Sequence, residues 1–89
     1  MSNNNIPYGK ILSPKQIGEA IRARRKELDV TQVKTAGFSK VGLRFLSELE
    51  RGKETAELGK TLTVLRRLGL DVFIAPRGNN RKAAETENG

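Results

Sequence analysis

The sequence predicts a mainly α-helical fold of four to five helices with one β-strand near the C-terminus. Its length of 89 residues is that of a single domain. Apolar residues recur at helical spacing across 17–68, and a run rich in β-branched and aromatic residues follows at 70–76, between a glycine and a proline. We therefore expect four parts: a mobile N-terminal arm at 1–12, a helical domain at 13–70, a strand at 71–76 and a disordered tail at 77–89.

Two helices are expected in the first half of the domain. Ser13 is a good N-cap and Pro14 fits the first helical position, so the first helix begins there and runs to about Leu28. Thr31 is an equally suitable cap for a second, shorter helix at 32–38. Two helices this close in sequence are expected to pack against each other.

Two further helices are expected after a tight turn at 39–42. The third spans 43–51, and Gly52 is well placed to end it. The fourth spans 57–68, and Gly69 ends it. Helical spacing assigns the following side chains to the inner faces of these two helices: Phe45, Leu46, Leu49, Leu58, Leu62, Leu65 and Leu68.

The segment 70–76 predicts a dimer. A single strand cannot satisfy its own backbone hydrogen bonds, and the chain offers no second strand to pair with it. The most economical partner is the same strand of a second copy, with Val72 and Ile74 on one face and Phe73 on the other. A domain this small also buries a low fraction of its surface, which again favours a homodimer.

Composition narrows the function. Seventeen Lys and Arg residues against ten Asp and Glu give a net charge of +7, and the chain contains no Cys and no His. These absences exclude zinc fingers and Cys or Ser-His hydrolases, so we expect no enzyme, no metal and no cofactor. No apolar run approaches the ~20 residues needed to cross a bilayer, so we expect no membrane partner and a cytoplasmic location. A basic domain of this kind is expected to bind nucleic acid.

A DNA-binding motif is carried by two short stretches. One is Thr31-Gln32 at the start of the second helix, and the other is the run 46–53, which reads LSELERGK. Their residue types and ungapped spacing resemble the helix-turn-helix domain of the phage-repressor (XRE) family, with the motif itself at 32–51. One position departs from the family pattern, because Lys40 stands where the turn usually has a glycine.

A narrower resemblance covers more of the domain. Residues 41–53, 55–56 and 64–70 are similar to the HipB-type antitoxins, which are transcriptional repressors encoded beside HipA-type toxin kinases. The lone strand before a polar tail is also similar to that group, in which such strands pair across the dimer. The resemblance implies a homodimer that binds an inverted-repeat operator in double-stranded DNA, represses its own promoter, and neutralises a HipA-like kinase.

The third helix is expected to read DNA, because its N-terminal end must enter a major groove ~12 Å wide. There Arg44 can bind guanine O6 and N7, Glu48 can accept from cytosine N4, and Leu43 can contact a thymine methyl group. Helix N-termini and nearby basic residues are expected to bind phosphates. The full set of DNA-binding candidates is Thr31, Gln32, Lys34, Lys40, Gly42, Leu43, Arg44, Ser47, Glu48, Arg51 and Lys53.

One further pair has a structural role. In the resembling family the position of Glu50 pairs with an arginine of the first helix, which corresponds to Arg25 in this sequence. The rest of the basic run at 22–26 is expected to lie mainly on the outer face of that helix.

Two alternative functions remain open from the sequence. One is a stand-alone XRE-family regulator without a toxin, and the other is a basic RNA-binding protein. An RNA-binding protein of this kind is expected to expose aromatic side chains for base stacking. All three phenylalanines fall at apolar-face positions, which favours DNA over RNA.

Overall fold

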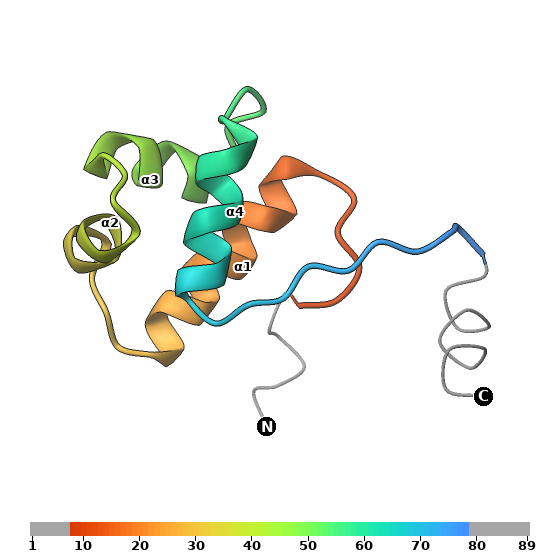
Figure 1. Cartoon of the computed structure of the whole chain (residues 1–89), viewed down its shortest axis with the longest axis horizontal. Coiled ribbons are helices and arrows are strands. Elements are labelled where there is room, and N and C mark those ends of the chain that lie inside the picture. The colour runs from red at the N-terminus through yellow and green to blue at the C-terminus, as the bar shows by residue number, and fades with distance from the viewer. Residues whose placement is uncertain (1–7, 79–89) are drawn as a thin grey trace.

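The computed structural model describes residues 8–78, and the expectations for residues 1–7 and 79–89 lie outside this part of the chain. Within it the chain forms four α-helices (Figure 1), close to the bounds that the sequence predicts. They are α1 (Pro14–Glu27), α2 (Gln32–Ser39), α3 (Leu43–Glu50) and α4 (Leu58–Arg67). None of the helices in this region is long and apolar enough to cross a membrane.

Polar caps explain where the helices begin. The Ser13 hydroxyl oxygen accepts a hydrogen bond from the backbone N–H of Gln16 at 3.3 Å, and the Thr31 hydroxyl oxygen accepts from that of Lys34 at 3.1 Å. Each bond satisfies one of the amides that a helix start leaves without a partner. Gly42 begins α3 without a side-chain cap, so no side chain stands in front of the first turn of that helix.

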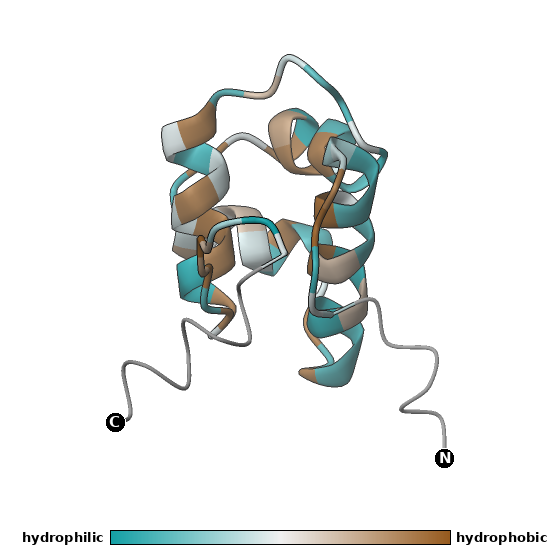
Figure 2. Cartoon of the chain, turned by 90° about the vertical axis from the view of Figure 1, so that its right-hand side faces the viewer, coloured by the Kyte–Doolittle hydropathy of each residue, from teal (hydrophilic) through white to brown (hydrophobic). Residues whose placement is uncertain are grey.

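One hydrophobic core joins the four helices. Ile21 of α1, Leu46 of α3 and Val64 of α4 are completely buried. Figure 2 shows the bands of hydrophobic residues that the helices carry. The buried cluster consists of Ile21, Ala36, Leu46, Leu49, Val64, Leu65 and Leu68.

Gly18 allows α1 to approach the end of α3 closely. A Cβ atom at this position would lie 2.6 Å from the backbone oxygen of Glu50, a distance that side chains do not tolerate. The missing side chain therefore brings α1 against the last turn of α3, where Arg25 of α1 meets Glu50. Sequence periodicity alone gave no indication of this close contact.

The prediction that Leu58 and Leu62 lie on the inner face of the fourth helix was wrong. Leu65 and Leu68 are buried, but Leu58 and Leu62 are 67% and 41% exposed. Thr61 lies on the buried face in their place, with its hydroxyl bonded to the backbone oxygen of Glu57 at 2.9 Å. The buried residues of this region are Thr61, Val64, Leu65 and Leu68, which follow helical spacing. This stripe leaves Leu62 at its edge and Leu58 in the first turn, so both stay partly in solvent in a single chain.

The segment 70–76 is not a strand in the described part of this single chain. It leaves the helices as an extended segment, on the opposite side of the molecule from α2 and α3 (Figure 1). Val72, Phe73 and Ile74 are 56%, 87% and 96% exposed. The expected strand is therefore unconfirmed, because a strand requires a hydrogen-bonding partner and residues 8–78 of one chain provide none.

Candidate nucleic-acid interface

The turn between α2 and α3 depends on Lys40. This residue ends α2 in the left-handed conformation, with φ 58° and ψ 44°. Its N–H donates to the oxygen of Gly37 at 3.2 Å, and the N–H of Val41 donates to that of Ala36 at 3.0 Å. These two bonds form the helix ending in which glycine is the usual left-handed residue. The helix-turn-helix geometry therefore persists although a lysine replaces the glycine.

The exposed face of α3 presents the expected base-reading residues together. The Arg44 side chain is 90% exposed, and Leu43 beside it is 47% exposed. Glu48, one turn further along, accepts from Arg44 Nε at 3.3 Å and from Lys53 Nζ at 3.0 Å. The Lys53 hydrogen bond, followed by that from Arg44, lowers the pKa of the Glu48 carboxyl. One carboxylate therefore holds two cations on the surface that would face DNA.

The same face continues into the loop after α3. Arg51 donates from Nη1 to the Ser47 hydroxyl oxygen at 2.9 Å. A shallow hollow of about 260 Å³ is lined by Glu48, Arg51, Gly52 and Lys53. Two cations at the edge of an open hollow suit a phosphate group better than a base edge.

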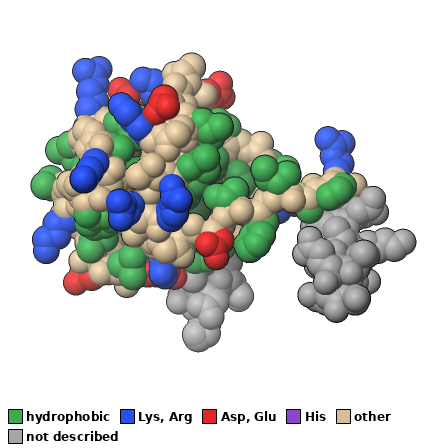
Figure 3. Space-filling model, viewed as in Figure 1, with side chains coloured by type: hydrophobic (Ala, Val, Ile, Leu, Met, Phe, Trp, Pro, Cys, Tyr) green, Lys and Arg blue, Asp and Glu red, His purple; other side chains and the backbone are tan. Residues whose placement is uncertain are grey.

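The start of α2 supplies a second group of candidates. The Thr31 hydroxyl oxygen is occupied by the cap to Lys34, but its hydrogen remains available to donate. Lys34, in the first turn of the same helix, is exposed to solvent. Figure 3 shows Lys and Arg side chains over the left part of the molecule, where α2 and α3 lie, and also over its centre, with Asp and Glu side chains among them at the top. The α2 and α3 side therefore offers cations to a negatively charged ligand, although it is not the only place where they lie on this face.

A buried ion pair supports the interface from behind. Arg25 donates from Nε to Glu50 Oε2 at 2.6 Å and from Nη2 to Oε1 at 3.0 Å. Only 11% of the Arg25 side chain and 4% of the Glu50 side chain are exposed. The hydrogen bond to Glu50 raises the pKa of Arg25, against the opposing effect of burial. Arg25 also donates to the backbone oxygen of Val30 at 3.0 Å, which ties down the chain before α2.

Gln32 has a contact that the sequence did not indicate. Its Nε2 donates to Glu50 Oε1 at 3.0 Å, so the first residue of α2 is joined to the last residue of α3. Sequence reasoning assigned Gln32 to DNA alone. The only available signal was the spacing that the helix-turn-helix motif imposes, which brings these two helix ends together.

Two of the three phenylalanines, which were expected at apolar-face positions, are exposed in the single chain. Phe38 is 41% exposed and Phe73 is 87% exposed, while Phe45 is half-buried with Lys60 Nζ 5.6 Å from its ring centroid. Because exposed aromatic side chains are what an RNA-binding protein is expected to show, the phenylalanines do not favour DNA over RNA. The choice between the two nucleic acids has to come from other observations.

Comparisons with known proteins bear on this choice. No protein-family model matches the chain. The chain is 45% identical over 73 residues to an uncharacterized HTH-type transcriptional regulator, y4mF, of Sinorhizobium fredii (strain NBRC 101917 / NGR234), which covers 82% of this chain and 96% of the relative.

Solved structures share the fold. A HipB–O4 20mer complex has a TM-score of 0.72 at 23% identity and covers 79% of this chain and 99% of that one. A complex of a HipB variant with an O2 20mer has the same TM-score, identity and coverage of this chain, with 97% of its own chain covered. A structure described as MDT Protein has a TM-score of 0.71 at 23% identity, with 79% and 99% of the two chains covered.

Proposed function

The chain belongs to the family of HTH-type transcriptional regulators, and on that basis we propose that it is a sequence-specific repressor that binds its own promoter. The observation that carries this proposal is the Arg44–Glu48–Lys53 cluster on the exposed face of α3. Arg44 is the most exposed of the three and lies in the first turn, where an extended guanidinium reaches a base edge.

Binding redistributes the contacts of this cluster. Arg44 leaves Glu48 for guanine O6 and N7, and Lys53 turns to a phosphate oxygen. The Glu48 carboxylate is then free to accept from cytosine N4. Phosphate contacts from Thr31, Lys34 and Arg51 add affinity without sequence preference.

Repression of this kind requires two half-sites. We propose a homodimer joined through residues 71–76, which places two α3 helices in successive major grooves about 34 Å apart on an inverted repeat. The exposed apolar side chains of Val72, Phe73 and Ile74 support this proposal, because a single chain leaves them in water. Phe73→Asp is expected to weaken dimerisation and operator binding together. If sedimentation shows an unchanged dimer, residues 71–76 are not part of the dimer interface.

We further propose that the chain is an antitoxin that binds and inactivates a HipA-like kinase. The residues that resemble the HipB-type antitoxins and the fold shared with HipB support this role. Candidate contact sites are Arg66, Arg67 and the segment 77–89. The alternative is a stand-alone regulator of the same family. Co-purification of a kinase-like protein from the native cell, encoded by the neighbouring reading frame, distinguishes the two.

A gel-shift experiment tests the DNA-binding proposal. The full chain is titrated against the duplex of its own promoter, a scrambled duplex of equal length and a structured RNA, at several salt concentrations. The promoter duplex is expected to bind at least tenfold more tightly than either competitor. Equal affinity for both duplexes would contradict sequence-specific binding. A preference for RNA would support the RNA-binding alternative.

A further inference from the structure

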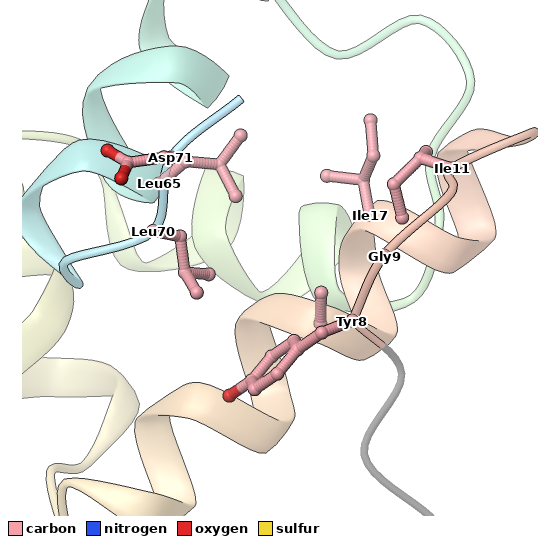
Figure 4. Close-up of a pocket in the computed structure, with 8 residues that line it drawn as sticks. Tyr8, Gly9, Ile11, Ile17, Leu65, Leu70 and Asp71 are labelled. Atoms are coloured by element: carbon pink, nitrogen blue, oxygen red, sulfur yellow. The ribbon is translucent and has the colours of Figure 1, made fainter. Parts of the chain in front are cut away.

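An apolar groove lies on the side of the molecule away from the DNA-binding face. Residues at both ends of the described chain line it, with Tyr8 and Ile11 on one wall and Leu70 and Asp71 on the other (Figure 4). Ile17 of α1 lies beside Ile11, and Leu65 of α4 lies on the side of Leu70 and Asp71. The groove has a volume of about 110 Å³. An apolar cavity of about 150 Å³ holds a benzene molecule, so this groove has room for one branched aliphatic side chain.

Both walls are anchored to the same turn of α1. The Tyr8 hydroxyl donates to Glu27 Oε1 at 2.8 Å, and Arg24 donates from Nη1 to the same oxygen at 3.2 Å. Arg24 also donates from Nε to the backbone oxygen of Leu68 at 2.8 Å, which fixes the end of α4 just before the second wall. The groove therefore exists before any partner binds, at little further entropic cost.

The chain cannot fill this groove with its own C-terminal segment. Leu70 lines the groove, and four extended residues carry the backbone about 13 Å from there to Ile74. Ile74 is 96% exposed as a result. A second copy of the chain has the same segment and the same groove. When two copies are related by a two-fold axis, the C-terminal segment of each copy can enter the groove of the other.

The size of the groove and the exposure of the C-terminal side chains indicate which side chain enters. The groove is smaller than the cavity of about 150 Å³ that holds a benzene ring, so an aliphatic side chain fits it better than the ring of Phe73. The two aliphatic candidates are Val72 and Ile74, which are 56% and 96% exposed. Ile74 of the partner subunit therefore has the most apolar surface to remove from water.

We infer that the groove binds Ile74 of the partner subunit, so that residues 8–12 belong to the dimer interface together with the C-terminal strand. This inference rests on the proposed homodimer and extends it, because strand pairing alone requires nothing of the N-terminal residues.

Disulfide trapping tests the inference, since the chain contains no native Cys. Ile11→Cys and Ile74→Cys chains are prepared separately, mixed, allowed to exchange subunits and oxidised. A disulfide requires the two Cα atoms to be about 4.4–6.8 Å apart, so it reports close approach only. The mixture is expected to give several-fold more covalent dimer than either variant alone.

The matched control is Leu12→Cys mixed with Ile74→Cys. Leu12 is the neighbour of Ile11 and 76% exposed, but it does not line the groove. Crosslinking equal to that of the Ile11→Cys mixture would overturn the inference.

Sedimentation of the reduced variants separates failure of the inference from failure of the proposed homodimer. A dimer without specific crosslinking means that the strands pair but the groove stays empty of Ile74. A monomer means that the homodimer itself is wrong, and the inference falls with it. Operator binding by the same samples reports independently on the DNA-binding role.

Discussion

Arg25 and Glu50 are joined by two hydrogen bonds that connect α1 to the last turn of α3, the helix that carries Arg44. Replacing Glu50 with alanine leaves the Arg25 guanidinium buried without its counter-charge and removes the acceptor of Gln32. Glu50→Ala is expected to lower the free energy of unfolding by about 3–5 kcal/mol. Urea denaturation measures the change. Thermal melting within a degree or two of the unmodified protein would show that the pair contributes little.

Base reading and phosphate binding are separable at Arg44 and Lys53. Arg44→Ala is expected to cost about 1–3 kcal/mol on the cognate operator and to flatten the preference at one base pair in each half-site. Lys53→Ala is expected to weaken cognate and scrambled DNA alike and to reduce the slope of log K against log[salt] by about one unit per site. Titrations on the operator, single-base variants and scrambled duplex measure both effects.

Arg22→Ala is a suitable control for these titrations, because Arg22 is an exposed arginine of α1 outside the proposed interface. It is expected to leave base preference unchanged. If Arg44→Ala lowers the affinity for every duplex equally, Arg44 binds a phosphate and the assignment of the reading face is wrong.

The ionisation of Tyr8 can be followed by ultraviolet absorption without interference, because Tyr8 is the single tyrosine and the chain has no tryptophan. Partial burial, and then the hydrogen bond to Glu27, raise its pKa from 10.0 to about 12. A raised pKa in the folded state means that this contribution to stability is complete below pH 10 and is lost as the pH rises towards 12. Ultraviolet titration of the tyrosinate should give a midpoint near 12 in the folded chain and near 10 in denaturant. Glu27→Gln should lower the folded midpoint, and a folded midpoint near 10 would contradict the contact.

Two buried hydroxyls on α2 are expected to reduce stability. Thr35 is completely buried, and neither its hydroxyl oxygen nor that of Ser39 has a hydrogen-bond partner among the described residues. Thr35→Val removes the hydroxyl at nearly constant shape and is expected to raise the free energy of unfolding by about 1 kcal/mol. The control is Thr61→Val, since Thr61 is also buried but its hydroxyl donates to the backbone oxygen of Glu57. A similar gain from both substitutions would exclude the unpaired hydroxyl as the cause.

Local signals allowed the helices and the motif to be predicted from the sequence. Ser13 and Thr31 cap the helices that they were expected to begin, because a cap depends on neighbours three residues away. The spacing of the motif likewise identified Arg44 and Glu48 as residues of the exposed face of α3, because helical periodicity fixes which residues share a face.

Features that depend on distant parts of the chain were not predictable in the same way. The exposure of Leu58 and Leu62 depends on how much of α4 the other helices cover. The basic run at 22–26 shows the same difference. The bond from Arg24 to the end of α4 was not indicated by the sequence. The resemblance to the family had named Arg25 as the partner of Glu50, and the structure joins these two side chains.

The hydrogen bond from Arg24 to the oxygen of Leu68 acts at the joint where the C-terminal segment leaves the helices, immediately before Gly69 turns the chain with φ 77°. In the proposed dimer, the backbone conformation at Leu68–Gly69 fixes how each α3 is oriented relative to the pairing segment. Because α3 lies far from this point, a small rotation there moves α3 by a larger distance. Arg24 and Gly69 would then affect the spacing between operator half-sites without contacting a base, and two regulators with the same α3 sequence would differ in operator choice if they differed at these residues.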